Sequence, residues 1–488
     1  MMRLVSSALL VLAAWPSEGQ VWTVARLKLP VQGPASSVPW VLGSESRLHI
    51  VESLPLGDFA LQPLPHSHST AEALVALFNA ATTTIDVLAM YWNLGGLEDR
   101  KQYTPAQMSA FGADQGANVL DALANAVRRN VSVRIVGSKS SQFTPTEIEG
   151  FVHDVRLWDA DHWYGGGIMH QKMVVVDGTH AYVGSANMDW KSLTQVMEVG
   201  VVVEAQPVVA QDMQRLFNLW WAFADPALVV SPTHTPVTVF SEAFQVDLRL
   251  PPWSAAAQPK APGPFDAAAT SSIYNKTHNL HTKLNDRAAG VFLSAAPEAA
   301  AARYRTTDED ALVYTIRSAT TTLALSVMDF VPFASYPLAT HPHGSIHWPA
   351  LTDALLGVVF ARPVVVRLLI SHWAHSSPVM HAALRQLQAQ AATCPQHGMG
   401  CLGRLEIRLL EVPGWNTTGT FPPFTRVNHA KFIVSDKRVN VGTSNMEWGY
   451  FYNTAGTSFN TDHPDAISSV QAIFDRNWNS PYAQPLSP

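Results

Sequence analysis

Hydrophobic and polar positions along the chain repeat one order of elements. In each half a helix-like stretch leads into an apolar, β-rich run, at residues 85–91 and again at 323–330. A helical segment follows, and then a second apolar strand pattern, at 131–136 and 364–369. Strands that alternate with helices predict an α/β layered fold, with a mixed sheet flanked by helices in each half.

The two halves also define the predicted domains. Proline and alanine are frequent at 251–272, which is typical of a connection between folded units. We therefore predict a first lobe at 50–232, an inter-lobe connection at 233–290 and a second lobe at 291–484.

A short polar motif is the clearest part of the repeat. Residues 170–177 and 429–436 both read H-x-K-x4-D, and G-[ST]-x-N follows each copy. A β-prone run follows each lysine, so the histidine and the lysine are expected on one face of a strand. The motif residues are His170, Lys172, Asp177 and Asn187 in the first copy, and His429, Lys431, Asp436 and Asn445 in the second.

Two such half-sites, packed about a pseudo-two-fold axis, contain the groups that cleave a phosphodiester. One imidazole can attack phosphorus while the other, protonated, donates to the leaving oxygen. Lysines and asparagines can hold the non-bridging oxygens, so the chemistry requires no metal or other cofactor. Asp177 and Asp436 are expected to brace the motif strands rather than to touch substrate. One copy of the motif is weak evidence, but two copies are specific.

Composition fits a large folded protein. The chain has 488 residues, of which 47% are hydrophobic and 14% charged, which argues against a disordered or coiled-coil protein. A net charge of −6 is unfavourable for nucleic-acid binding at pH 7. Protonation of the 19 histidines would make the chain cationic in an acidic compartment, unless many of them are buried and never titrate.

The N-terminus and the sequons favour the secretory pathway. Arg3 precedes an apolar run at 4–15, and small residues follow. We predict a signal peptide at 1–19, with a short membrane anchor as the alternative. Three N-x-[ST] sequons are expected to carry glycans, at Asn130, Asn275 and Asn416.

The chain has two cysteines, Cys394 and Cys401. Their close spacing in a loop predicts a local disulfide in an oxidising compartment. A metal site that also uses His397 is the alternative, but four good ligands are not apparent.

Aromatic residues near the motifs are candidates for stacking on the bases of a single strand. Each of them could instead belong to the core. The candidates are Trp190, Phe330, His375 and Trp448.

The duplicated H-x-K-x4-D with G-[ST]-x-N resembles the signature of the phospholipase D superfamily. The run at 184–196 resembles the animal phospholipase-D-like proteins of the endolysosome, family members three and four, and the likeness extends over 51–482. The resemblance implies two phospholipase-D-type lobes with the active site at their pseudo-two-fold interface. It also implies a homodimer.

The same resemblance implies an acid 5′→3′ exonuclease on single-stranded DNA and RNA. By analogy His170 is the nucleophile and His429 the general acid, although the sequence itself does not order them. Glu198 matches an acidic position that orients a catalytic histidine, whereas Gly456 stands at the equivalent place in the second half. Those relatives carry a cytosolic tail and a transmembrane anchor, neither of which we expect here.

We therefore expect a metal-independent phosphodiesterase that acts on the 5′ end of single-stranded nucleic acid, in the lysosomal lumen or secreted. A phospholipase D or transphosphatidylase, including synthesis of bis(monoacylglycero)phosphate, is the alternative, because a lipid headgroup presents the same diester. A catalytically inactive binding protein is a third possibility, against which the intact motifs argue.

Overall fold

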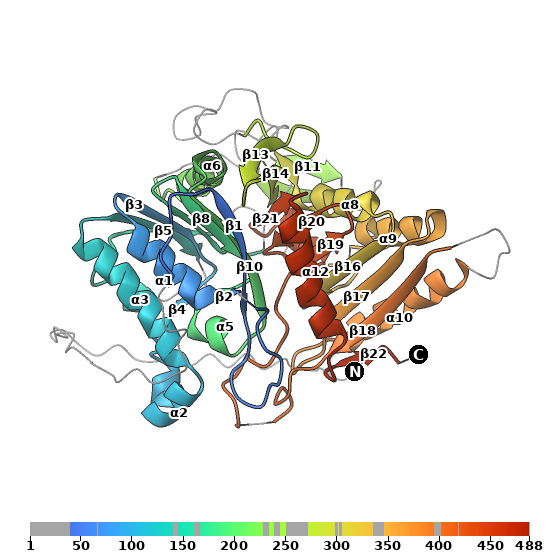
Figure 1. Ribbon diagram of the computed structural model, residues 1–488, viewed down its shortest axis with the longest axis horizontal. Coiled ribbons are helices and arrows are strands. Elements are labelled where there is room, and N and C mark those ends of the chain that lie inside the picture. Colours follow the sequence, from blue (N-terminus) through green and yellow to red (C-terminus); the bar gives the residue numbers. More distant parts are fainter. Residues whose placement is uncertain are drawn as a thin grey trace. The chain divides into compact units, whose positions relative to one another are not determined.

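Two α/β lobes follow each other along the chain, as the repeat predicts (Figure 1). The computed structural model describes residues 40–487 except 66, 140–144, 161–165, 228–233, 239–244, 250–271, 298–300, 302–304, 335–345, 395–401 and 418. The expected signal peptide, 1–19, lies outside the described residues, as does most of the proline- and alanine-rich connection. No helix in the described part is long and apolar enough to cross a membrane.

The first lobe is built on a mixed sheet of order β2-β1-β10-β8-β7-β3-β5-β6. Its parallel pairs join β1 to β2, β3 to β5 and β5 to β6, and the motif strand β7 runs antiparallel to β3. The elements are β1 Arg47–Ser53, β2 His68–Ser69, α1 Thr70–Ala80, β3 Thr84–Leu88, β4 Trp92–Asn93, η1 Asp99–Lys101, α2 Pro105–Ala110, α3 Ala113–Arg128, β5 Ser132–Ser138, η2 Pro145–Glu147, β6 Asp154–Trp158, β7 Met173–Val176, β8 His180–Gly184, β9 Met188–Asp189, α5 Trp190–Thr194, β10 Glu198–Glu204 and α6 Pro207–Phe223.

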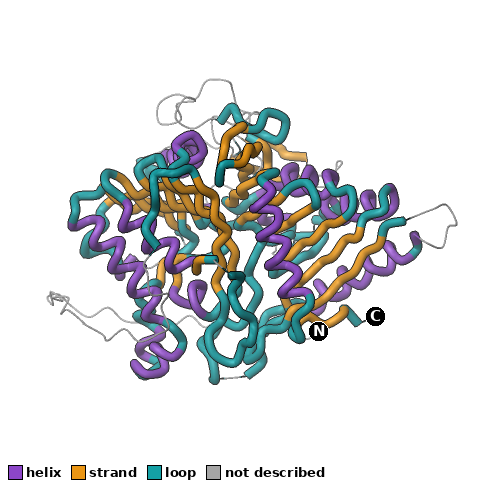
Figure 2. The backbone as a smooth tube through the Cα atoms, viewed as in Figure 1, coloured by secondary structure: helices purple, strands orange, loops and turns teal. Residues whose placement is uncertain are grey.

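The second lobe repeats this plan in the order β13-β14-β21-β20-β19-β16-β17-β18-β22, with β15 beside β14. Helices lie beside the strands in both lobes (Figure 2). A separate pair, β11 and β12, lies between the lobes in sequence. The remaining elements are β11 His234–Thr238, β12 Gln245–Arg249, β13 Leu280–Leu284, β14 Arg287–Ala296, β15 Thr306–Thr307, α8 Asp308–Ser318, β16 Thr322–Val327, α9 Ala350–Ala361, β17 Val365–Ser371, α10 Pro378–Ala392, β18 Arg404–Leu410, β19 Phe432–Ser435, β20 Val439–Gly442, α11 Trp448–Tyr452, β21 Gly456–Thr461, α12 Pro464–Trp478 and β22 Ala483–Pro485.

The second sheet begins earlier than the sequence predicts. The predicted boundary at 290/291 falls inside β14, and β13 pairs with β14 along its whole length. Both strands therefore belong to the second sheet, not to the connection. The hydrophobic pattern misses β13 because only its end residues, Leu280 and Leu284, are apolar, with three polar residues between them.

Strand alternation explains why each sheet carries helices on both faces. In β7, Val175 belongs to a core that includes α6, whereas Val174 and Val176 belong to a core that includes α1 and α3. Successive strand residues point to opposite faces, so one continuous valine run serves both cores. The motif strand is thereby buried on both sides.

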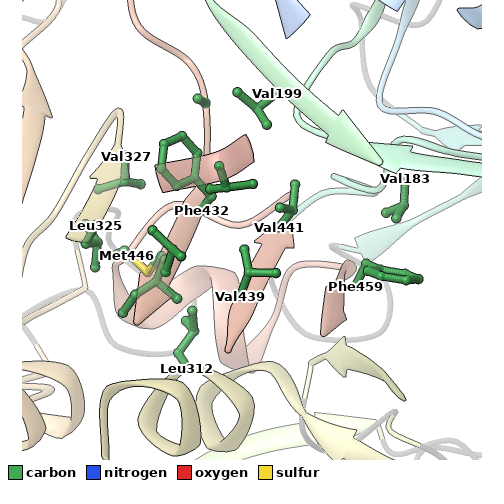
Figure 3. Close-up of a cluster of buried hydrophobic side chains, with 14 of the residues drawn as sticks. Val183, Val199, Leu312, Leu325, Val327, Phe432, Val439, Val441, Met446 and Phe459 are labelled. Atoms are coloured by element: carbon green, nitrogen blue, oxygen red, sulfur yellow. The ribbon is translucent and has the colours of Figure 1, made fainter. Parts of the chain in front are cut away.

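The lobes share one apolar core. Val183 and Val199 of the first lobe lie in the same buried cluster as Val441 and Phe459 of the second (Figure 3). Strands β8 and β10 contact β20 and β21 there. Burying a side chain as large as Phe459 stabilises the native state by about 2–3 kcal/mol, so the two half-sites are held together by packing.

An ion pair also joins the lobes. Arg476 of α12 donates to both carboxylate oxygens of Glu52 in β1, at 2.9 and 2.8 Å. Glu52 is 3% exposed. A buried carboxylate is tolerated when it is paired in this bidentate way, which also fixes the relative position of the partners.

Candidate active site

Backbone pairing between the lobes positions both motif histidines. The N–H of His170 donates to the carbonyl of Ala455 at 2.9 Å, and the N–H of His429 donates to the carbonyl of Met197 at 2.8 Å. Each histidine is thus fixed by the lobe to which it does not belong. The repeat therefore forms one composite site rather than two separate ones.

A glycine permits the first of these contacts. Gly167 has φ +99°, and a Cβ built on it would lie 1.9 Å from the carbonyl oxygen of Asn453. Only glycine adopts this backbone conformation without strain and leaves room for the opposing backbone. In the sequence, Gly167 is the last of three consecutive glycines at 165–167.

The two imidazoles face each other across the interface. Their ring centroids are 6.4 Å apart with an interplanar angle of 64°. Reacting atoms in a productive complex lie about 3–3.5 Å apart, so a phosphorus atom between the rings can reach both. His170 is 3% exposed, and His429 has 13% of its side chain exposed.

Glu198 of β10 holds His429 from the opposite lobe. The Nδ1 of His429 lies 2.9 and 3.0 Å from the two carboxylate oxygens. Burial would raise the pKa of Glu198, but the charge and hydrogen bond of His429 outweigh it and the pKa is lowered. The carboxylate is therefore ionised, orients the ring and leaves Nε2 of His429 for the reaction.

His170 lacks an equivalent partner. Its buried Nδ1 has no side-chain hydrogen bond among the described residues, and Gly456 stands where Glu198 stands in the other half. Burial lowers the pKa of His170 well below its ordinary value, and the charges of Lys172 and Lys431 lower it further. The two histidines therefore differ: His170 is kept neutral, while a carboxylate stabilises the imidazolium of His429.

The two motif lysines are buried in matching positions. The Nζ of Lys172 donates to the carbonyl of His170 at 2.9 Å, and that of Lys431 to the carbonyl of His429 at 2.7 Å. Burial lowers the pKa of Lys431 to about 8, partly opposed by Glu198. An anionic phosphate would add a countercharge close to both buried ammonium groups.

The asparagine of the first half is held by a tyrosine, which is held in turn by an aspartate, and sequence analysis missed both. The Nδ2 of Asn187 donates to the hydroxyl of Tyr91 at 3.3 Å, and this hydroxyl donates to Asp189 at 2.9 Å. Burial and the charge of Asp189 raise the pKa of Tyr91 well above its ordinary value, so the phenol stays neutral.

The asparagine of the second half is held differently. The Nδ2 of Asn445 donates to Asp329 at 3.2 Å and to the hydroxyl of Tyr450 at 3.1 Å. The ring of Tyr450 packs edge-on against His170, with centroids 4.9 Å apart. Tyr91 and Asp329 stand at equivalent positions after β3 and β16, so aligning 85–91 with 323–329 would have pointed to both.

The motif aspartates lie away from the reacting groups. Asp177 accepts hydrogen bonds from the backbone of residues 82–84, and Asp436 does the same for 320–322. Burial raises the pKa of Asp177, but these hydrogen bonds outweigh it and lower the pKa to about 2. Both carboxylates connect the end of the motif strand to the start of the neighbouring strand.

Three aromatic candidates belong to the core instead of a binding surface. Trp190, Phe330 and Trp448 are only 0, 3 and 2% exposed, so none of them can stack on a base. The two tryptophans begin the short helices α5 and α11, which turn their rings inward. His375 is exposed and stacks on Phe424, which is 64% exposed, with ring centroids 4.8 Å apart.

The predicted covalent features lie outside the site. Cys394 is disulfide-bonded, and the other cysteine of the chain, Cys401, lies outside the described residues. Asn130 and Asn416 are exposed and Asn275 is partly exposed, so glycans could be attached to all three.

Comparisons with known proteins agree with this geometry. The family model described as "PLD3/4, PLD-like domain" matches residues 253–402, and "Cardiolipin synthase, PLD-like domain" matches 74–221. The crystal structure of phosphatidylserine synthase from Haemophilus influenzae superposes with a TM-score of 0.50 at 12% identity, covering 85% of each chain. At this identity the structural likeness shows a shared fold alone.

Curated relatives cover nearly the whole chain. "Phospholipase D Y" from Dictyostelium discoideum is 32% identical over 90% of this chain and 92% of its own length. "5'-3' exonuclease PLD3" from Bos taurus is 32% identical over 90% of this chain and 80% of its own length. Together with the duplicated motif and the composite site, this similarity shows that the chain belongs to the phospholipase D superfamily, in the group that includes the PLD3 relatives.

Proposed function

We propose that this phospholipase D superfamily phosphodiesterase is an acid 5′→3′ exonuclease on single-stranded DNA and RNA that works through a phosphohistidine. The observation that carries the mechanism is the hydrogen bond from His429 to Glu198, across from a His170 that lacks such a partner. This asymmetry favours His170 as the nucleophile and His429 as the general acid.

In the first step the Nε2 lone pair of His170 forms a bond to phosphorus. The bond from phosphorus to the leaving oxygen breaks, and that oxygen takes the proton of His429. In the second step water attacks phosphorus, His429 takes a proton from the water, and the bond to His170 breaks. The net change is hydrolysis of one diester bond, and both histidines return to their initial states.

The lysines stabilise the negative charge on the non-bridging oxygens in both steps. Lys172 and Lys431 are buried beside the two histidines, where electrostatic interactions are stronger than in water. The residues present thus supply nucleophile, acid and charge stabilisation from the chain itself.

Two observations support single-stranded nucleic acid as the substrate. Several relatives are named 5'-3' exonucleases. His375 and Phe424 also present a stacked, exposed aromatic pair, and Trp373 packs against His375 at 4.7 Å. Trp373 shares a buried cluster with Val427, two residues before His429, so this pair lies on the segments that lead to the site. Exposed aromatic faces bind single strands without sequence preference.

A phospholipase D or transphosphatidylase is the second candidate. Other relatives of equal similarity are named phospholipase D. In transphosphatidylation an alcohol would replace water in the second step, and the same four motif residues would act. A binding protein without activity is disfavoured because both half-sites are complete.

Acidic pH fits the electrostatics of the site. Burial lowers the pKa of His429, and Glu198 only partly opposes this. The imidazolium that the first step needs is therefore populated below the ordinary titration range of histidine. We accordingly place the protein in the lysosomal lumen or in an acidic extracellular setting, as a disulfide-bonded Cys394 would also fit.

The deciding experiment is hydrolysis of a 5′-hydroxyl single-stranded oligonucleotide in EDTA at about pH 5, beside a phosphatidylcholine vesicle assay. Stepwise shortening from the 5′ end is the expected result. If the lipid headgroup is released or exchanged while the oligonucleotide stays intact, the protein is instead a phospholipase D or transphosphatidylase.

The variant His170→Ala tests the nucleophile. We expect turnover to fall at least about 10³-fold, because the covalent step is lost. His278→Ala, an exposed histidine outside the site, is the matched control and should retain activity. Hydrolysis by His170→Ala at the rate of the unmodified protein would exclude the phosphohistidine mechanism.

A further inference from the structure

One partly buried carboxyl group in the site, that of Asp329, has no part in the mechanism above. Asp329 follows β16, and the N–H of Met446 donates to its carbonyl at 2.9 Å, which fixes it beside Asn445. In the first lobe the equivalent place, after β3, is taken by Tyr91. The two half-sites therefore contain an acid in one copy and a neutral hydroxyl in the other.

The two asparagines differ in how many of their side-chain N–H donors are already used. A side-chain amide has two N–H donors. In Asn187 one of them donates to Tyr91 and, among the described residues, the second has no partner. In Asn445 both are used, one by Asp329 and one by Tyr450. Asn445 can therefore donate to a phosphate oxygen only if it gives up one of these two partners.

The charges of Asp329 and Lys431 also restrict the access of a phosphate to the second half-site. Lys431 is the cation that the second half-site offers to the phosphate. Its positive charge lowers the pKa of Asp329, and the negative charge of Asp329 raises the pKa of Lys431. The other groups around the pair are the phenol of Tyr450, the ring of His170 against that phenol, and Glu198, which acts on Lys431 from the opposite lobe. An ionised Asp329 attracts Lys431 and repels an anionic diester.

We propose that Asp329 is a positioning residue whose protonation opens the second half-site to the phosphate. When ionised, it retains the amide of Asn445 and competes with the diester for Lys431. When neutral, it is a weaker acceptor and carries no charge, like Tyr91 in the first half, so Asn445 and Lys431 become available. The proposal rests on the phosphodiester chemistry of the site and holds for a nucleic acid or a lipid substrate.

Asp329 changes its protonation state at mildly acidic pH. Burial raises the pKa of Asp329 to about 6, against the opposing charge of Lys431. Asp329 is thus neutral below this pH and ionised above it, so binding of an anionic diester should weaken as pH rises through this region.

The experiment uses bis(4-nitrophenyl) phosphate, a diester whose own charge does not change between pH 5 and 7. KM and kcat are measured at both pH values for the unmodified protein and for Asp329→Asn and Asp329→Glu. We expect KM of the unmodified protein to rise about tenfold over this range, since one pH unit above a pKa leaves about a tenth of the group protonated. In Asp329→Asn the rise should be less than about threefold, and in Asp329→Glu it should persist.

Asp308→Asn is the matched control. Asp308 is buried, and burial raises its pKa to about 6, as it does for Asp329. It is hydrogen-bonded to Ser294 and Ser444 rather than to the phosphate-binding groups. This variant should keep the pH dependence of KM of the unmodified protein. A rise in KM with pH that is the same in Asp329→Asn as in the unmodified protein would overturn the proposal.

Sulfate binding to the unmodified protein gives a second, independent test. Calorimetry in buffers of different ionisation enthalpy measures proton uptake on binding, which we expect above pH 6 because sulfate stabilises neutral Asp329. Absence of uptake would overturn the proposal even if Asp329→Asn fails to fold. Because this test needs no turnover, it also separates a failure of this inference from a failure of the proposed exonuclease activity.

Discussion

At the scale of single residues, one contact distinguishes the two catalytic histidines. Glu198 bonds to Nδ1 of His429, and no side chain among the described residues does so for His170. Glu198→Gln keeps the shape of the acceptor but removes the charge that stabilises the imidazolium. We expect kcat/KM to fall about 10²-fold and its alkaline limb to move to lower pH, because the pKa of His429 decreases further. A pH–rate profile measures both effects.

Glu204→Gln is the control for this variant. Glu204 lies at the other end of β10 and pairs with His49 at 2.7 Å, outside the site. It should leave the pH–rate profile unchanged. An unshifted profile in Glu198→Gln would remove the basis for assigning the general acid to His429.

At the scale of elements, the motif aspartates connect strand ends. Asp177 has φ 52° and accepts hydrogen bonds from the backbone N–H groups of residues 82–84, which lead into β3. We expect Asp177→Ala to lower the free energy of unfolding by about 2 kcal/mol at pH 7, measured by urea denaturation. Because the pKa of Asp177 is lowered to about 2, its contribution is present above its ordinary pKa of 3.8 and is lost as pH falls toward 2.

Asp177→Asn is the matched comparison at this turn. Asparagine tolerates the left-handed conformation and retains one acceptor oxygen, so its loss of stability should be smaller than that of Asp177→Ala. Equal losses in the two variants would show that the charge of the carboxylate, which both variants lack, determines the effect rather than the retained acceptor oxygen or the backbone preference of asparagine.

At the scale of the whole molecule, function depends on the approach of one lobe to the other. Gly167 combines φ +99° with direct apposition to the backbone of Asn453. We expect Gly167→Ala to separate the half-sites and reduce kcat/KM at least about 10²-fold, since small misplacements of reacting groups are this costly. Steady-state kinetics and thermal unfolding together measure the effect.

Gly178→Ala is the control, because Gly178 also has positive φ, +58°, but a Cβ there meets nothing within 4 Å. It should cost about 1 kcal/mol of stability and retain activity. Activity in Gly167→Ala equal to that of Gly178→Ala would contradict the need for close lobe contact.

Local sequence patterns predict the strands of each lobe but not the contacts between distant residues. Period-two and helical patterns act over a few residues, so the strands at 85–91 and 131–136 are close to β3 and β5. The same patterns do not indicate which aromatic rings turn inward. For that reason the stacking role predicted for Trp190 and Trp448 is wrong, because both rings are buried. Asp329 was missed because its partner, Asn445, is more than a hundred positions away along the chain.

The sequence by itself determined the duplicated α/β lobes and the motif residues, since local periodicity and a repeated signature encode both. Only the tertiary structure decided that Glu198 holds His429, that His170 stays without such a partner, and that Asp329 restrains Asn445. These contacts join segments that are distant along the chain. They form because the lobes pack through a shared apolar core, and no local pattern specifies how two buried surfaces meet.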